Sequence, residues 1–374
     1  MQLYGKDYSV AALRKRIGNM DQVAGIQRVT LDDGNERGVR AAVLRTGAGL
    51  EVTVLLDRGM DIASAHHNGR AMGWRSTTGS VAPQYYEPEG FRWLRSYFGG
   101  LMTTCGLSRV GGPGPDSALK GDGLHGRISH IPARDIQVSQ GWEGGAYKMS
   151  ITGTMRETSV FGENLTLTRT VSATLGDEKF QIHDVVANEG FKKTGLMLLY
   201  HCNIGWPALD AGSRILAPSA KVAPRDAEAA DGKERWHLMD APIHGYKEKC
   251  YYHDMAPDRN GKVTVAMINN GFPKNGFGVY VSYSKKELPR FMQWKQMGEQ
   301  DYVCGFEPCI CTLEGREREE ELGLLNYLKA GEQREFHLEF GALSTAEELY
   351  ALERNLAGKK PVFVDSYADC DSRR

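Results

Sequence analysis

The sequence lacks any long run of apolar residues and any strong excess of one charge. Nowhere do about 18 apolar residues follow one another, as a membrane-spanning helix requires, and residues 1–8 carry no apolar stretch of a signal peptide. We therefore expect no membrane association and no export, with the cytoplasm as the location. Lys and Arg total 46 against 47 Asp and Glu. Such a balance does not provide the positive field that binds nucleic acid, so nucleic acid is not an expected partner.

Cysteine is sparse, with seven residues scattered through 374. An odd number in so long a chain does not indicate a disulfide framework, and reduced thiols are expected. Recognised metal-binding spacings are missing, because neither His66-His67 nor the cysteines of 304–311 match a zinc motif. The glycines of 111–114 lack the lysine of a phosphate-binding loop, and no Gly-x-Ser-x-Gly nucleophile motif is found. We predict no metal and no cofactor.

Glycine, by contrast, is abundant at 44 residues, and it separates short segments rich in Val, Ile, Thr, Tyr and Phe. This arrangement is typical of many strands joined by turns. The predicted strands lie at 42–44, 50–55, 164–171, 179–186, 197–200, 263–268, 278–283, 291–294 and 335–340. No β-α-β alternation and no solenoid repeat accompanies them, so an all-β antiparallel structure is expected.

Helices are expected to be few and peripheral. Ser9 is placed to cap a helix over 10–17, and Ser344-Thr-Ala-Glu has the form of a capping box that opens a terminal helix closed by Gly358. The segments 111–117 and 218–249 show little periodicity, and each is either a linker or a long loop at a binding site. One β domain over 1–374, with a core at about 25–345, is the simplest organisation.

Two histidine segments carry candidate chemistry. Glycines flank His125, and such backbone freedom suits close approach to a ligand, although a loop histidine bonded to backbone groups is the alternative. His201 and Asn203 follow an apolar strand, and they face the same side if the strand alternates, whereas Cys202 faces the other. The alternative is a buried histidine within a core strand.

A third segment places Glu307 between Phe306 and Pro308. An acid in so apolar a setting should have a raised pKa and could then accept a proton near neutral pH. A core glutamate paired with an arginine is the alternative. Glu299 and Asp301 lie in a polar turn and are expected to be solvated charges.

Four further residues are candidates for holding a polar ligand. Arg58 and Asp61 flank a glycine turn after a strong strand, where a forked guanidinium and a carboxylate suit hydroxyl groups. An ion pair that stabilises the turn is the alternative there. Trp294 offers a stacking face, and His253 a further polar group, although both also fit a buried position in a sheet.

In chain order, these segments resemble the motifs of the aldose 1-epimerase (galactose mutarotase-like) superfamily. Leu124-His125-Gly126 resembles its first histidine motif, His201-Cys-Asn-Ile-Gly-Trp is an altered form of its second, and Phe306-Glu307-Pro308 resembles its late Glu-Pro motif. The family's early arginine motif is not recognisable, and Arg58 is one residue that could replace it. The resemblance implies a divergent branch, a large twisted antiparallel β-sandwich with a few peripheral helices, and a small carbohydrate as substrate.

The resemblance also implies an isomerase that interconverts the anomers of a free sugar or sugar derivative without metal or cofactor. Glu307 would take the proton of the anomeric hydroxyl while a charged His201 protonates the ring oxygen, with His125 and Asn203 orienting hydroxyls. Two alternatives stay open: an isomerase or lyase acting on a keto or acidic sugar, and a carbohydrate-binding protein without turnover. The sequence identifies neither the sugar nor the oligomeric state.

Overall fold

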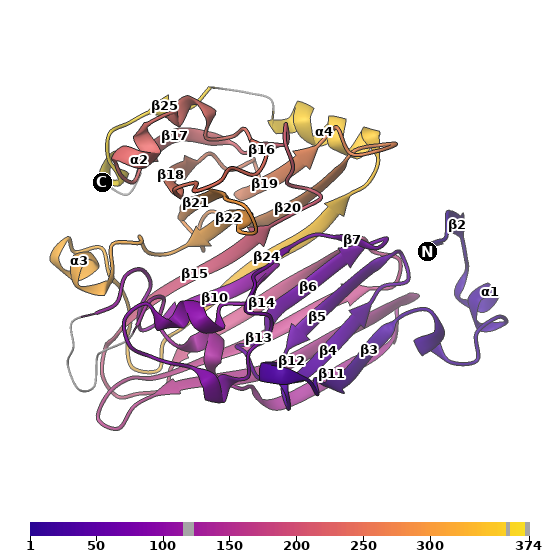
Figure 1. Cartoon of the computed structure of the whole chain (residues 1–374). Coiled ribbons are helices and arrows are strands. Elements are labelled where there is room, and N and C mark those ends of the chain that lie inside the picture. The colour runs from indigo at the N-terminus through magenta and orange to yellow at the C-terminus, as the bar shows by residue number, and fades with distance from the viewer. Residues whose placement is uncertain (115–122, 357–359, 371–374) are drawn as a thin grey trace.

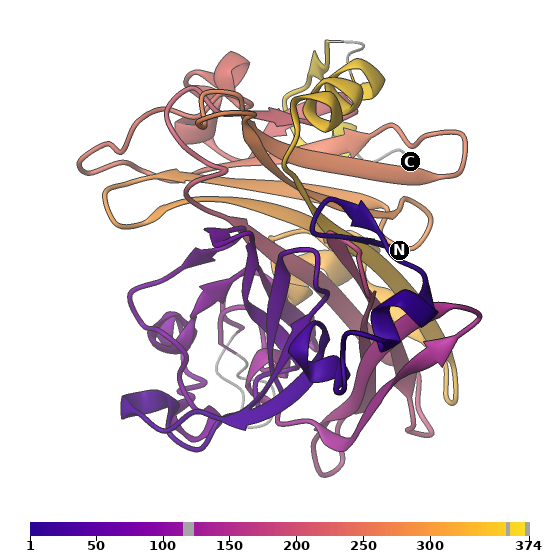
Figure 2. The same ribbon diagram turned by 90° about the vertical axis from the view of Figure 1, so that its right-hand side faces the viewer.

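The computed structural model describes residues 1–114, 123–356 and 360–370. Within these residues, two large and mainly antiparallel sheets form the body of the molecule (Figures 1 and 2). The larger has the order β25 (Val362–Phe363), β17 (Ser219–Pro224), β18 (Lys249–Met255), β21 (Arg290–Met297), β22 (Tyr302–Cys309), β15 (Thr194–Ile204), β10 (Met102–Leu107), β6 (Asp61–His67), β5 (Leu50–Leu55), β4 (Arg40–Arg45) and β3 (Gly25–Thr30), with β23 (Asn326–Leu328) beside β15 and β7 (Arg70–Ala71) beside β6.

The remaining elements are the second sheet, two short ladders and the helices. This sheet has the order β11 (Arg134–Glu143), β12 (Ala146–Thr158), β13 (Asn164–Thr174), β14 (Lys179–Asn188), β24 (Gln333–Leu343), β20 (Phe277–Ser284), β19 (Lys262–Asn269) and β16 (Arg214–Leu216). Two short ladders pair β1 (Gln2–Leu3) with β2 (Lys6–Asp7), and β8 (Trp74–Arg75) with β9 (Gly99–Gly100). The helices are α1 (Val10–Arg14), α2 (Ala227–Ala230), α3 (Arg316–Glu321), α4 (Ala346–Leu356) and α5 (Tyr367–Cys370), with 3₁₀ turns η1 (Met20–Gln22), η2 (Gly34–Glu36), η3 (Pro83–Tyr85), η4 (Arg92–Ser96), η5 (Ile128–His130) and η6 (Lys233–Arg235).

The core lies between the two sheets because their strands alternate apolar and polar side chains. In β14, Phe180 and Ile182 are buried while Gln181 points outward. Phe180 stacks on Phe340 of β24 at 5.2 Å between ring centroids. The larger sheet contributes Tyr200 of β15 and other apolar residues to the same core. Full burial of each such side chain stabilises the fold by about 1.5–3 kcal/mol.

The predicted strands all fall within observed strands, and 50–55 coincides with β5. The expected all-β sandwich with few helices is confirmed. Ser9 does cap α1, whose Ala12 N–H donates to the Ser9 hydroxyl at 3.1 Å, but α1 ends at Arg14 rather than at 17. The segment 218–249, expected to be a linker or a long loop at a binding site, contains β17 and α2.

The capping box before α4 lies one residue later than predicted. The Glu348 carboxylate accepts hydrogen bonds from the backbone N–H groups of Ser344 and Thr345, and the Glu348 N–H donates to the Thr345 hydroxyl at 3.2 Å. The reciprocal pair is thus Thr345 and Glu348. Gly358, expected to close this helix, lies outside the described residues. Among the helices that are described, none has the length and apolar character needed to cross a membrane.

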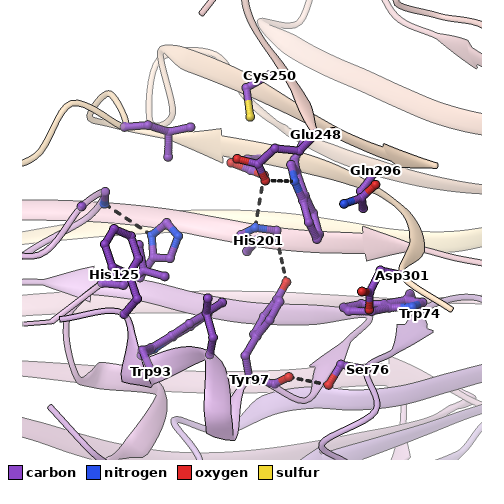
Figure 3. A pocket seen from close by; sticks show the side chains of 18 of the residues that line it. Trp74, Ser76, Trp93, Tyr97, His125, His201, Glu248, Cys250, Gln296 and Asp301 are labelled. Carbon is purple, nitrogen blue, oxygen red and sulfur yellow. Dashed lines mark hydrogen bonds and ion pairs between the residues drawn. The ribbon is translucent and has the colours of Figure 1, made fainter. Parts of the chain in front are cut away.

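Three central strands of the larger sheet position the candidate site. In β15 and β22, Tyr200 and Phe306 face the core between the sheets. His201 and Glu307, the next residues along each strand, therefore face the opposite side. That side is covered by the chain around η4, which lies over the strands in Figure 3.

Candidate active site

A cavity of about 650 Å³ lies on the outer side of the larger sheet (Figure 3). Strands β21, β22 and β15 form its floor, and the chain segments around β8, η4 and residue 125 form its walls. Its aromatic lining consists of Trp74, Phe91, Trp93, Tyr97 and Trp294. Its polar lining consists of Ser76, Thr77, Thr78, His125, His201, Arg225, Glu248, Gln296, Asp301 and Glu307. Aromatic faces with a few convergent polar groups are typical of a small-molecule site.

Strand register brings His201 and Glu307 together. β15 and β22 are antiparallel, and Cys202 lies opposite Phe306, so the neighbouring His201 and Glu307 meet on the cavity side. The His201 Nε2 atom lies 3.3 Å from Glu307 Oε1. Gly305 leaves room for this contact, because a Cβ there would lie 2.7 Å from Glu307 Oε1.

Hydrogen bonds determine which nitrogen of His201 carries its proton. The Asn203 amide nitrogen donates to the carbonyls of His201 and Gly99 at 2.9 and 3.3 Å, which leaves Asn203 Oδ1 to accept from the Tyr97 hydroxyl at 2.7 Å. Tyr97 has one hydroxyl proton, so its oxygen accepts from His201 Nδ1 at 3.1 Å. In a neutral ring, Nε2 then presents its lone pair to Glu307.

Burial sets the charges of this pair. The exposed fractions of the His201 and Glu307 side chains are only 9% and 2%. Burial raises the pKa of Glu307 to about 8, and the negative charge of Glu248 adds to the effect. Burial lowers the pKa of His201 to about 4. The two shifts favour a protonated Glu307 beside a neutral His201 at neutral pH. A charged His201, which the sequence leaves possible, is therefore disfavoured, because burial disfavours the imidazolium.

His125 enters the cavity from a strained backbone. Its φ is +60°, in the left-handed region, and its Nδ1 accepts from the Gly111 N–H at 3.3 Å. Burial lowers the pKa of His125 to about 3, so the neutral ring carries its proton on Nε2. Gly126 is needed beside it, since a Cβ there would lie 2.5 Å from the Gly106 carbonyl oxygen. The glycines around His125 thus permit the close approach expected from the sequence.

A second acid lies near the pair. Glu248 Oε2 accepts from the Trp294 indole N–H at 2.7 Å, and Glu248 Oε1 lies 3.2 Å from the guanidinium of Arg225. Arg225 also contacts Asp226 at 3.1 Å. The positive charge that Arg225 brings to the cavity is thus offset by two carboxylates, and the hydrogen bond to Glu248 fixes the orientation of the Trp294 ring.

The structure gathers four of the predicted site residues around one cavity. Glu307, His201, His125 and Trp294 all line it. Asn203 shares the face of His201, as strand alternation predicts, but it is fully buried and contacts the Tyr97 hydroxyl instead of the cavity. The expected direct contact of Asn203 with a ligand is therefore wrong. Asn203 instead supports the Tyr97 hydroxyl.

The other predicted ligand contacts are wrong, because protein groups already occupy these side chains and none of them lines the cavity. Arg58 is buried and donates to the carbonyls of Ser129 and Ser96 at 2.7 and 2.9 Å. Its neighbour Asp61 forms a buried ion pair with Arg169 at 2.9 Å. Asp61 thus forms an ion pair, as the alternative for this turn proposed, whereas Arg58 bonds to backbone carbonyls.

His253 also lies outside the cavity lining, because it bonds to other side chains. Its Nδ1 lies 2.9 Å from the Ser219 hydroxyl, and its Nε2 lies 3.3 Å from Gln293 Oε1. Burial lowers the pKa of His253 to about 3. Glu299 pairs with the exposed His244 at 2.8 Å, whereas Asp301, although exposed, does reach the cavity lining.

Tyr97 and Trp93 are functional candidates that the sequence did not reveal. They lie at η4, a short 3₁₀ turn without periodicity, and their rings stack at 4.5 Å. The one available signal is the density of aromatic residues between Tyr85 and Phe98. The sequence also did not reveal Arg225, which precedes α2, or Glu248, which precedes β18. Their partners lie far away in the sequence.

Loop and metal-ligand chemistry around the cavity is limited. Gly111 and Gly112 line it, but residues 115–117 of the predicted loop lie outside the described residues. In the described ranges, three His, Cys, Asp or Glu ligand atoms converge at one place alone, on β14 and β24. The described lining of the cavity therefore contains no such group of three ligand atoms. All seven cysteines are buried and free, and Cys250 is the one in the cavity lining.

Comparisons with known proteins give the same fold. A family model described as a domain of unknown function (DUF4432) matches residues 36–342. A Klebsiella pneumoniae protein provisionally named aldose 1-epimerase superposes with a TM-score of 0.87 at 24% identity, covering 93% of this chain and 94% of that one. A galactose mutarotase-like protein from Clostridium acetobutylicum gives 0.59 at 13% identity, covering 87% and 100%. The galactose 1-epimerase of Lactobacillus acidophilus gives 0.55 at 14% identity, covering 86% and 99%. No curated protein matches in sequence.

Proposed function

Because the chain belongs to the DUF4432 family and has a galactose mutarotase-like fold, we propose that it is a carbohydrate isomerase that interconverts the anomers of a free sugar or sugar derivative. One observation carries the proposal. His201 and Glu307 face each other at 3.3 Å in the floor of the cavity, and their shifted pKa values favour a single transferable proton on the pair at neutral pH. Anomer exchange requires such a pair, since one group must remove a proton while the other supplies one.

Glu307 and His201 can together supply and remove every proton that the reaction needs. With Glu307 protonated and His201 neutral, His201 Nε2 takes the proton of the anomeric hydroxyl while Glu307 gives its proton to the ring oxygen. The bond between the anomeric carbon and the ring oxygen breaks, and an aldehyde or ketone forms. Rotation of the carbonyl carbon exposes its other face. On reclosure, the charged His201 returns a proton to the carbonyl oxygen and the Glu307 carboxylate takes one from the open-chain hydroxyl, which restores the pair.

The roles differ from those expected from the sequence, where Glu307 was the base and His201 the acid. The number of protons on the pair is the same in both schemes, and the two heavy atoms are only 3.3 Å apart. A bound sugar that adds hydrogen bonds to the Glu307 carboxylate would move the proton to His201. Burial favours the assignment with Glu307 as the initial acid in the empty site.

The remaining lining suits an uncharged sugar. Trp74 and Trp294 lie edge to face at 6.2 Å and offer apolar surfaces for a sugar ring. Among the described lining residues, Arg225 is the one Lys or Arg, and Glu248 already neutralises it. His125 Nε2–H and the Tyr97 ring lie beside the catalytic pair as orienting groups. A carboxylate or phosphate on the substrate would face Glu248 and Asp301 without a free cation there.

Saturation-transfer NMR of the purified protein tests the proposal. The anomeric signals of neutral aldoses, ketoses, deoxy sugars and uronic acids are followed with and without the protein. We expect exchange above the solvent rate for at least one neutral sugar and less for its uronic acid. A carbohydrate-binding protein without turnover would broaden the sugar signals without transferring saturation between anomers, and that result across the panel would overturn the proposal.

A further inference from the structure

A second group of histidines and glutamates lies on the sheet that does not carry the cavity. Strands β14 and β24 run side by side there (Figure 1), and His183 lies directly opposite His337 in their register. The neighbours Phe336 and Leu338 are buried in the core, so His337 points away from it. The imidazole rings of His183 and His337 stack at 4.3 Å with an interplanar angle of 8°.

Each histidine has its own carboxylate. His183 Nε2 lies 2.9 Å from Glu335 Oε2, and Glu335 is on the same face of β24 as His337. Glu287, from the turn between β20 and β21, holds the other ring: Glu287 Oε1 lies 3.1 Å from His337 Nδ1, and Glu287 Oε2 accepts the His337 backbone N–H at 2.8 Å. The ring of His337 is therefore fixed in orientation and tautomer by Glu287.

We infer that His183, Glu335 and His337 form a binding site for a divalent transition metal ion of the zinc class. One ligand atom from each residue lies within 4.8 Å of the other two, so modest side-chain rotation brings all three onto one ion. All three side chains are between 41% and 52% exposed, which allows that rotation. With Nδ1–H donated to Glu287, His337 Nε2 keeps its lone pair for the metal.

The arrangement matches the chemistry that zinc selects. Imidazole nitrogen and carboxylate oxygen are its common ligands beside thiolate, and a fourth position is filled by water in open sites. A carboxylate that accepts the second N–H of a ligating histidine is the usual outer partner, and Glu287 occupies that position.

The site is invisible as a sequence motif. His183 and Glu335 are separated by 152 positions and meet through strand pairing. The proposed site departs from the prediction of no metal, which rested on the spacing of contiguous segments such as His66-His67. The inference is independent of the proposed isomerase, because the cluster lies on the second sheet and shares no residue with the cavity lining.

Zinc titration of the untagged, full-length protein against a chromophoric chelator tests the inference. We expect one equivalent of Zn²⁺ to bind to the wild type, with affinity reduced more than about tenfold in H183A and in H337A, and about tenfold to a hundredfold in E287Q. Co²⁺ in place of Zn²⁺ should give visible absorption bands of a site with nitrogen and oxygen ligands, absent in the double variant H183A/H337A. Zn²⁺ should also raise the Tm of the wild type but not that of this double variant.

Two control variants locate the binding. H244A removes an exposed histidine that also pairs with a glutamate, Glu299, but has no second histidine beside it, and it should bind zinc as the wild type does. H201N alters the cavity and should also retain the zinc equivalent. Absence of binding by the wild type at 100-fold excess of Zn²⁺ would overturn the inference. So would undiminished binding by H183A/H337A, or loss of binding in H201N.

Discussion

Two histidine–glutamate pairs of similar geometry lie on different sheets of this molecule. His201 and Glu307 approach to 3.3 Å, and His183 and Glu335 to 2.9 Å. Their exposure differs: the first pair is 9% and 2% exposed, and the second is 41% and 51% exposed. The residue types and distance are therefore insufficient to assign chemistry. What surrounds the pair decides whether it moves a proton or remains open to ions from solvent.

The surroundings of the two pairs differ because chain covers the larger sheet at His201 and Glu307, whereas His183 and Glu335 are about half exposed. The chain around η4 lies over β15 and β22, and Tyr97 from that segment fixes the ring of His201. Water is thereby excluded, and the pKa of Glu307 rises to about 8 while the pKa of His201 falls to about 4. On the outer face of β14 and β24, the side chains of His183 and Glu335 remain 41% and 51% exposed.

The largest expected effect comes from breaking the buried pair. Glu307→Gln keeps the shape of the side chain but transfers no proton, so the rate of anomer exchange should fall by a factor on the order of 10²–10⁴. His201→Asn should have a similar effect, and the double variant should be little slower than either single one, because the two residues act as a unit. Glu299→Gln, a change of the same kind outside the cavity lining, is the matched control. Saturation-transfer NMR measures all four rates, and a double variant slowed by the product of the single effects would contradict the shared role.

The pH profile of exchange tests the proton count of the same pair. His201 gains a second proton for the pair below about pH 4, and Glu307 loses the only one above about pH 8. The catalysed rate should be flat between these values and fall about tenfold per pH unit outside them. Circular dichroism at each pH checks that the protein stays folded. A rate that peaks sharply near pH 6.5, the usual histidine pKa, would contradict a pair with widely separated values.

Removing the support of His201 should have a smaller effect. Tyr97→Phe deletes the hydroxyl between Asn203 and His201, which frees the ring to take the wrong tautomer, and kcat should fall at least about tenfold with little change in KM. Unpaired buried groups should also lower the free energy of unfolding by about 1–3 kcal/mol. Tyr252→Phe is the control, because its buried hydroxyl bonds to Glu314 outside the cavity lining. Equal loss of kcat in both variants would show a general stability effect instead.

The exposed pair should matter least for exchange. Glu335→Gln should leave the anomer exchange rate unchanged and alter the free energy of unfolding by no more than about 1 kcal/mol in metal-free buffer, as for most surface ion pairs. Urea denaturation and exchange NMR on the same preparation check both values. A tenfold change in the anomer exchange rate would mean that the exposed pair influences the cavity. That result would contradict the separate roles of the two pairs.

The sequence predicted the sheets well because strand alternation is a local property. The apolar and polar side chains of residues 50–55 and 179–186 follow a strand pattern, and both segments form strands. Glu307 was identifiable for a similar reason, since its apolar neighbours already indicate burial. The single-domain organisation and the roles of the site residues stay predictions.

Contacts across the fold could not be predicted in the same way. Arg58 and Asp61 have the residue types of a sugar site, yet backbone carbonyls and Arg169 from distant segments occupy them. Tyr97 sits in a segment without periodicity, and its importance arises from hydrogen bonds to two residues more than a hundred positions away. A charged His201 is possible from the sequence because an isolated imidazole titrates near neutral pH, whereas burial under the cover over the sheet lowers its pKa.

The proposed mechanism requires that His201 and Glu307 share one proton, with Nδ1 of His201 protonated and Nε2 free. Nitrogen NMR of protein with ¹⁵N-labelled histidine side chains, with H201N used to assign the signal, measures this directly. Between about pH 5 and pH 7, we predict one protonated and one unprotonated ring nitrogen, with Nδ1 protonated and no imidazolium until about pH 4. A doubly protonated ring at pH 7, or a neutral ring protonated on Nε2, would contradict it.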